Sequence, residues 1–264
     1  MNRKTILLFI SFIVLLTLAC NATFTVGFPT PTVEPAAPAP TAVSVPTSQP
    51  LTVSRLMYEE VGQNPDFTIK AEFPAILDNT DPGVSKFNRV AHDLVQAAID
   101  EFKRNVSEKP IDPNFSASFL DVKYTLTHQA ESVLSIKFDF SYYLAGAAHP
   151  GDHSLTLNYD LGQDRELVLD DLFVPNSNHL EIISQYCIAE LGKRDIGFTG
   201  AFEEGAEPTA ENYRNWNILP EGLMVTFDTY QVAPGAAGPQ VVLVPYDRLE
   251  ELIDPQGALA GFIR

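Results

Sequence analysis

Residues 133–161 constrain the fold most, because two consecutive stretches there alternate apolar and polar side chains with a period of two. The first stretch, residues 133–143, places four apolar side chains on one side: Ile136, Phe138, Phe140 and Tyr142. The second stretch also places four on one side: Leu155, Leu157, Tyr159 and Leu161. This period is typical of half-buried strands, and the turn between them, residues 146–153, is rich in Gly, Pro and Asp. We therefore expect a long antiparallel pair at the centre of a sheet.

The residues before this pair predict three more strands and a long helix. The strands are expected over residues 51–61, 67–77 and 119–128, where apolar and polar side chains again alternate. The helix is expected over residues 84–106, because apolar side chains recur there at steps of three and four. Asp81 or Ser85 would cap its first turn.

The residues after the pair predict shorter elements. Their expected order is a strand and turn over residues 165–173, a helix over 178–193, strands over 223–230 and 241–244, and a helix over 246–253. Residues 216–219 lead into the first of these two strands, and loops are expected over residues 195–211 and 231–239. Cys187 lies on the apolar stripe of the first helix, which predicts a small buried side chain and not a reactive thiol.

These elements predict an α+β fold, an antiparallel sheet packed against a few helices. The chain is long enough for one large domain or for two lobes that share a sheet or an interface. For a division into lobes, we expect an N-terminal lobe over residues 51–130 and a C-terminal lobe over residues 131–254. Residues 255–264 would then be a tail.

Residues 1–20 have the pattern of an export signal. Arg3 and Lys4 precede an apolar stretch, residues 5–18, and Ala19 stands directly before Cys20. This pattern resembles a bacterial lipoprotein signal peptide, in which Cys20 carries fatty acids such as palmitate and becomes the new N-terminus. The alternative is an uncleaved signal anchor that happens to contain a cysteine.

Residues 21–50 predict an extended tether. Between Pro29 and Pro50 there are seven prolines and four threonines, but no Lys or Arg. Such a segment cannot bury a core and favours polyproline II. We therefore expect an extracytoplasmic domain of the cell envelope that reaches the membrane only through its lipid anchor.

The chain is strongly acidic, with a formal net charge of −17. An acidic surface repels phosphate backbones, so nucleic acid is excluded as a partner. The charge would favour a basic partner, although many exported proteins are acidic simply for solubility.

Two groups of side chains have the right atoms for chemistry. His149, Asp152 and His153 share one turn and could contribute to a zinc-like site, but no distant fourth ligand accompanies them. Asp170 and Asp171 form a pair of carboxylates, but they stand in a turn that would expose them to water. The sequence contains no nucleophile elbow, metalloprotease helix motif or phosphate loop. We therefore expect no metal, no cofactor and no enzymatic activity.

Three segments carry a resemblance to a known family. They are residues 141–149 with the strand that follows, residues 167–173, and residues 223–239 continued by residues 244–249. Together they resemble the extracellular domain of unknown function found in the anti-sigma-V factor RsiV and ahead of the catalytic domain of the peptidoglycan deacetylase PdaC. The resemblance covers most of residues 51–254.

In RsiV this domain binds lysozyme, so the resemblance implies an exported ligand-binding module. We do not expect signalling or deacetylation, because the sequence shows no sigma-binding segment and no deacetylase domain with metal-binding histidines. The family's usual Gly-Gly-Ala-His is Gly-Ala-Ala-His at residues 146–149.

If the ligand-binding role holds, two loops should contact the ligand, which would be a basic extracellular protein such as lysozyme or a cell-wall component. Gly, Pro and small side chains let the backbone approach a partner closely. The expected contact residues are His149, Pro150, Asp152, His153, Tyr230, Pro234 and Gly238. One alternative is that these are ordinary turn residues. The protein as a whole could instead be an envelope hydrolase acting on wall glycan, or a purely structural lipoprotein.

Overall fold

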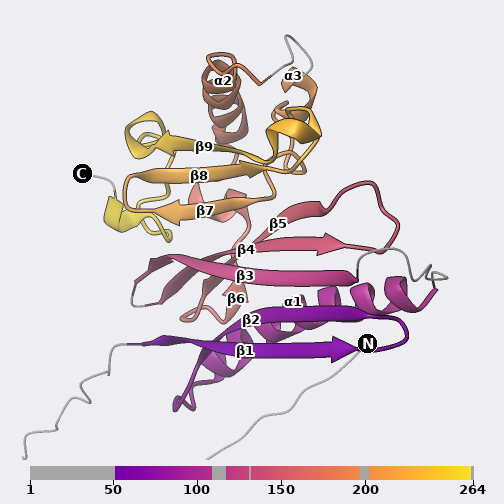
Figure 1. Ribbon diagram of the computed structural model, residues 1–264. Coiled ribbons are helices and arrows are strands. Elements are labelled where there is room, and N and C mark those ends of the chain that lie inside the picture. The colour runs from indigo at the N-terminus through magenta and orange to yellow at the C-terminus, as the bar shows by residue number, and fades with distance from the viewer. Residues whose placement is uncertain (1–50, 109–116, 131, 197–201, 263–264) are drawn as a thin grey trace, which may run out of the picture. The chain divides into compact units, whose positions relative to one another are not determined.

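The first six strands form one sheet in which neighbours in space follow the order of the chain (Figure 1). The computed structural model describes residues 51–108, 117–130, 132–196 and 202–262. The strands are β1 (Val53–Gly62), β2 (Phe67–Ile76), β3 (Ser118–Gln129), β4 (Val133–Tyr143), β5 (Gly151–Asp160) and β6 (Arg165–Glu166). The long pair predicted from the alternation is β4 and β5, which are antiparallel. The predicted α+β fold is confirmed.

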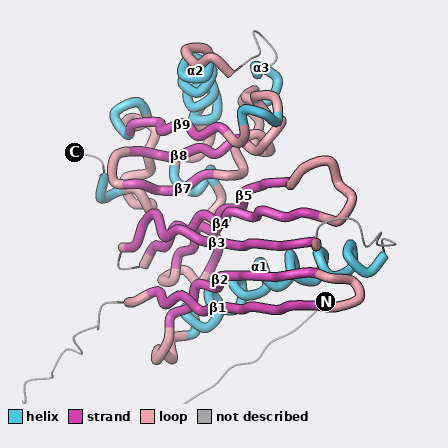
Figure 2. Tube along the Cα trace, in the orientation of Figure 1, coloured by secondary structure: helices cyan, strands magenta, loops and turns pink. Residues whose placement is uncertain are grey.

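Helix α1 (Pro82–Glu108) covers one face of this sheet (Figure 2). Its first turn is capped by Asp81, whose Oδ1 accepts hydrogen bonds from the N–H groups of Gly83 (2.8 Å) and Val84 (3.4 Å). The apolar side chains of α1 and of the facing strands form the first core. Its largest fully buried members include Ile69, Phe87, Ile136, Phe138 and Tyr159.

Strands β2 and β3 are parallel, whereas the other strand pairs of this sheet are antiparallel. The reason is that α1 carries the chain back across the sheet before β3 begins. The ladder between β2 and β3 stops at Ala71 and Val122. Beyond that point the Glu72 carboxylate accepts a hydrogen bond from the Tyr124 N–H (3.1 Å). The Glu72 side chain therefore provides a hydrogen-bond acceptor for β3 where the backbone pairing with β2 has ended.

The rest of the chain builds a second, three-stranded sheet from β7 (Trp216–Leu219), β8 (Gly222–Phe227) and β9 (Gln240–Pro245). The helices of this part are α2 (His179–Leu191) and α3 (Phe202–Gly205), with 3₁₀ helices at Leu169–Leu172, Gly235–Ala237, Tyr246–Arg248 and Ala260–Phe262. Their apolar side chains form the second core, which includes Cys187, Trp216, Leu249 and Leu259. The burial predicted for Cys187 is confirmed, and burial raises the pKa of its thiol to about 12.

Three expectations for this part differ from the structure. The helix predicted over residues 246–253 is wrong, because a 3₁₀ helix at Tyr246–Arg248 is followed by turns and Ile253 forms an isolated bridge with Phe173. A backbone that pairs with another segment cannot continue a helix. Residues 216–219 form a strand of their own. Leu259, in the segment predicted as a tail, is fully buried.

The chain changes sheets between β6 and β7, that is, between residues 166 and 216. The lobe boundary expected near residue 130 falls between β3 and β4, which pair with each other within the six-stranded sheet. A short turn between two long strands resembles a domain boundary in sequence, although the ladder continues across it.

A buried polar joint connects the two sheets. The Ser135 hydroxyl of β4 donates to Asn158 Oδ1 of β5 (2.6 Å) and accepts from the Ile218 N–H of β7 (3.0 Å). The Asn158 amide donates to the Trp216 carbonyl (2.8 Å), and the Asn217 amide donates to Ser135 Oγ (3.0 Å). The side chains of Ser135, Asn158 and Asn217 are polar and buried, so β7 is held by specific hydrogen bonds.

Candidate functional site

An acidic groove lies on the sheet face opposite α1. Because side chains alternate, the positions between the buried residues of β3, β4 and β5 all project from this opposite face. The strand register places Asp121 of β3 beside Ser141 of β4, and Lys123 beside Asp139. In turn, Ser141 lies beside Asp152 of β5, and Asp139 lies beside Ser154. The groove has a volume of about 280 Å³ and is lined by residues that include Asp121, Lys123, Asp139, Ser141, Asp152, Ser154 and Pro239.

Carboxylates outnumber cations in the groove. Asp121 pairs with Lys123 (3.1 Å), and Asp139 pairs with Lys137 and accepts from the Ser154 hydroxyl (3.0 Å). Asp152 at the start of β5 is exposed. The groove therefore offers a negative, hydrogen-bonding surface to a partner.

The loop between β8 and β9, residues 228–239, closes one side of the groove. Asp228 Oδ1 accepts a hydrogen bond from the Ser154 N–H at the outer edge of β5 (2.9 Å). Its Oδ2 accepts from Arg214 (2.9 Å) and Asn215 (3.1 Å). Asp228 is thus a fixed connection between β5 and the C-terminal part, and Pro239 reaches the groove from the far end of the same loop.

Tyr230 is the exposed aromatic residue of this loop, with 66% of its surface accessible. Its backbone has a φ of 71°, and its ring lies against Gly235, where a Cβ would come within 2.3 Å of the ring. The neighbouring Gln231 amide donates to the carbonyls of Gly205 and Asn212, each at 2.9 Å. The ring is therefore held in an exposed position by a well-bonded loop.

The other expected contact residues lie in three places: at the groove, in the two loops, and on the face of the sheet that α1 covers. Asp152 lines the groove; Pro234 and Gly238 lie in the loop next to Pro239, and Gly238 has a φ of 66°. His149 and Pro150 are exposed in the β4–β5 turn, where His149 Nδ1 lies 2.8 Å from the Pro150 carbonyl. Contact of these residues with a ligand stays a prediction.

His153 points away from Asp152, toward α1. Its ring stacks on that of Phe140, with 4.6 Å between ring centroids and an interplanar angle of 1°. Burial lowers the pKa of His153, and nearby Asp228, Glu101 and Asp152 oppose this shift. Because adjacent strand residues face opposite ways, Asp152 and His153 cannot share a metal ion. Across the described ranges, no three His, Cys, Asp or Glu side chains gather as metal ligands.

Asp170 and Asp171, which the sequence suggested as a pair of carboxylates, have different partners in the structure. Asp171 accepts hydrogen bonds from Arg165 (2.6 Å) and from the Val168 N–H (2.8 Å). Asp170 Oδ1 lies 2.9 Å from His179 Nε2, and His179 Nδ1 lies 3.1 Å from the Ser177 hydroxyl. The two carboxylates therefore do not act as a pair, but a Ser–His–Asp chain of hydrogen bonds exists at the start of α2.

The sequence did not single out Asp121, Lys123, Asp139, Ser141 or Asp228. The first four are the polar positions of alternating strands, so a register for β3, β4 and β5 could have grouped them. Nothing in the sequence indicates that Asp228 contacts the edge of β5. Cys20 and the tether lie outside the described residues. None of the helices in the described part is both long and apolar enough to cross a bilayer.

Comparison with known proteins finds a match to a family model in the C-terminal part. Residues 170–247 match DUF3298, a protein family of unknown function. The peptidoglycan-N-acetylmuramic acid deacetylase PdaC of Bacillus subtilis is 28% identical over 165 residues, which are 62% of this chain and 35% of PdaC. The chain thus spans about a third of the length of PdaC, and the resemblance to PdaC predicted from the three segments is confirmed.

Two further similarities bear on fold and function. A Mycobacterium tuberculosis protein named as an esterase is 24% identical over 178 residues, covering 67% of this chain and 78% of that protein. The crystal structure of a DUF3298 member from Bacteroides fragilis superposes with a TM-score of 0.60 at 17% identity, over 80% of this chain and 96% of that one. The structural likeness supports the fold alone.

Proposed function

We propose that residues 51–262 form an extracytoplasmic binding domain that recognises a basic partner at the acidic groove. The observation that carries the proposal is the junction of β5 with the 228–239 loop. There, carboxylates from three strands lie beside a loop that presents Tyr230. Fixed carboxylates steer a basic protein and give specificity, while an exposed aromatic residue supplies contact area.

We further propose that the domain is attached to the membrane through a lipid on Cys20. The export pattern of residues 1–20 and the proline-rich residues 21–50 support this attachment. A Cys20→Ala protein should leave the detergent phase and appear in the aqueous phase while the domain stays folded. Partition of Cys20→Ala equal to that of wild type would contradict lipidation.

Titration with lysozyme, a basic extracellular protein, tests the groove. Residues Ser48–Arg264 form one compact unit that contains both cores, so this lipid-free unit is suitable. We expect saturable binding that weakens with salt and is lost in Asp152→Asn and Tyr230→Ala proteins that remain folded. Asp93→Asn on α1 removes the same charge from an exposed position away from the groove and should bind like wild type. Absence of binding at high micromolar lysozyme would overturn lysozyme as the partner.

Ester hydrolysis is a second candidate, supported by the Ser177–His179–Asp170 chain. A hydroxyl, an imidazole and a carboxylate linked by hydrogen bonds are the arrangement that activates a serine nucleophile. A related protein carries the name esterase. The same contacts also tie the 3₁₀ helix Leu169–Leu172 to α2, and the Asp170 side chain is 71% exposed, so the binding domain stays the first proposal.

A short-chain ester assay separates the two candidates. For an esterase, hydrolysis of p-nitrophenyl acetate should disappear in Ser177→Ala and persist in Ser141→Ala, a groove serine without a histidine partner among the described residues. Equal rates for wild type and Ser177→Ala would contradict the second candidate.

A further inference from the structure

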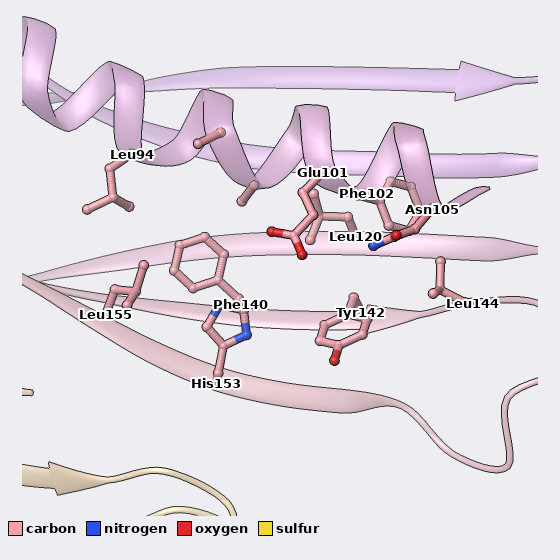
Figure 3. Close-up of a pocket in the computed structure, with 12 residues that line it drawn as sticks. Leu94, Glu101, Phe102, Asn105, Leu120, Phe140, Tyr142, Leu144, His153 and Leu155 are labelled. Atoms are coloured by element: carbon pink, nitrogen blue, oxygen red, sulfur yellow. The ribbon is translucent and has the colours of Figure 1, made fainter. Parts of the chain in front are cut away.

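A second cleft lies on the other face of the same strands, between the C-terminal half of α1 and the ends of β3, β4 and β5 (Figure 3). Its volume is about 250 Å³. Much of its wall is apolar, including Leu94, Phe102, Leu120, Leu144 and Leu155. Phe140 and His153 line both this cleft and the acidic groove. The other residues of the cleft do not line the groove, whose carboxylates lie on the opposite face of the sheet.

Three aromatic rings form one side of this cleft. His153 stacks on Phe140, and the Tyr142 ring meets His153 edge-on, with 6.2 Å between centroids. Tyr142 is held in place because its cross-strand partner is Gly151, where a Cβ would lie 2.6 Å from the Tyr142 ring. Tyr142, expected on the buried face, is 37% exposed, so it stands at the mouth of the cleft.

A carboxylate faces these rings from the helix. Figure 3 shows the Glu101 carboxylate pointing from α1 toward Phe140, Tyr142 and His153. None of the residues that line the cleft is Lys or Arg, and Glu101 makes no salt bridge with any described residue. Since burial favours the neutral form of His153, this ring adds no opposing charge at neutral pH.

From this juxtaposition of an aromatic wall and a carboxylate, we propose that the cleft binds a small organic cation of the alkylammonium class. Ring faces attract cations, and quaternary ammonium groups are bound by aromatic cages of this kind. Glu101 supplies the balancing charge, and the apolar wall receives the methyl groups that a hydrated metal ion lacks. The proposal is independent of the acidic groove and of its partner.

Choline and its neutral isostere 3,3-dimethylbutan-1-ol test the proposal, because they share a shape and differ in charge. Amide NMR titration of the Ser48–Arg264 unit should show saturable choline binding, with a Kd on the order of 1 mM, at Glu101, Tyr142 and His153. The alcohol should bind at least about tenfold more weakly. Equal affinity for both compounds, or choline shifts elsewhere only, would overturn the proposal.

Two variants on α1 give matched controls. Glu101→Gln should weaken choline binding by about tenfold, and Asp100→Asn, which removes a charge from the adjacent exposed position, should change it less than about twofold. Ala98→Leu should fill the cleft and abolish choline binding; circular dichroism checks that the variant is folded. An equal loss in Asp100→Asn and Glu101→Gln would show that only general acidity attracts choline, which would overturn the site.

Binding to lipid vesicles distinguishes a lipid headgroup from a soluble molecule as the source of the ammonium group. Co-sedimentation with phosphatidylcholine vesicles that choline displaces would support a lipid headgroup as the ligand. Choline binding without co-sedimentation would support a soluble ligand of the same chemistry.

Discussion

The two cores of the molecule are built in different ways. The first core lies between α1 and the six-stranded sheet and is made by long elements whose periods of two and 3.6 run for ten residues or more. The second core is made by short strands, helix α2 and several 3₁₀ helices, and it includes single residues such as Leu249 and Leu259 from turns. The first core is thus built from long regular elements, whereas the second core depends on short elements and on residues in turns.

The strongest test of this contrast is Phe138→Ala in the first core. Phe138 is fully buried in the longest strand pair, so we expect a loss of about 3–5 kcal/mol in the free energy of unfolding. Urea melts followed by circular dichroism measure the loss. Trp216, the single tryptophan of the chain, reports by fluorescence on the second core.

If the polar joint couples the cores, the Phe138→Ala melt should have the same midpoint by both probes. A Trp216 transition that stays at the wild-type midpoint would mean that the second core is stable alone. A loss below about 1 kcal/mol would contradict the central place of Phe138.

The joint itself is tested by Ser135→Ala. The substitution leaves the buried Ile218 N–H and the Asn217 amide without the acceptor they use, which should cost about 1–3 kcal/mol. We expect the Trp216 transition to move to lower urea more than the circular dichroism transition does. Ser141→Ala makes the same change at a partly exposed position of β4 and should shift neither midpoint by more than a small amount.

A smaller effect, confined to the first core, is expected from Asp81→Ala. Removal of the cap of α1 should cost about 1 kcal/mol in thermal or urea unfolding. Asp93→Ala, within the same helix and exposed, serves as the control. If both substitutions cost the same, the effect of Asp81 comes from charge and not from the cap.

The smallest effect concerns the acid side of the stability profile. Burial would raise the pKa of the Asp171 carboxyl, but hydrogen bonds from Arg165 and the Val168 N–H outweigh burial and lower it. A lowered pKa in the folded state gives stability above the unfolded pKa, which is lost as the pH falls through the folded value. Asp171→Asn should therefore cost less than about 1 kcal/mol at neutral pH and make the acid-side decline shallower. Exposed Asp247→Asn should leave the profile unchanged.

The first core could largely be predicted from sequence, because long alternating and helical stretches leave little choice of element. The bounds expected for β4, 133–143, are those of the structure, and α1 begins two residues before the expected start. The direction of β3 could not be predicted, since alternation is the same for parallel and antiparallel strands. In the second core, Pro245 suggests the start of a helix, but a bridge between Phe173 and Ile253, distant in sequence, prevents it.

Only some of the residues at the candidate groove could be predicted from the sequence. The turn after β4 and the 228–239 loop can be recognised in the sequence because both contain Gly and Pro. Asp121, Lys123 and Asp139 resemble the ordinary solvent-facing positions of strands. Only the register across β3, β4 and β5 and the contact of Asp228 with Ser154 bring them together. Such long-range pairing is not contained in any local pattern.

The buried joint also limits how this fold can be inherited and recombined. Residues 170–247, which match the family, include β7 but not Ser135 and Asn158, whose side chains satisfy the backbone of Trp216 and Ile218. A gene fragment that begins at residue 170 would encode β7 without the side chains that bond its backbone. Since β4 is itself an interior strand, the smallest segment that can move intact between proteins must reach back to the start of the six-stranded sheet.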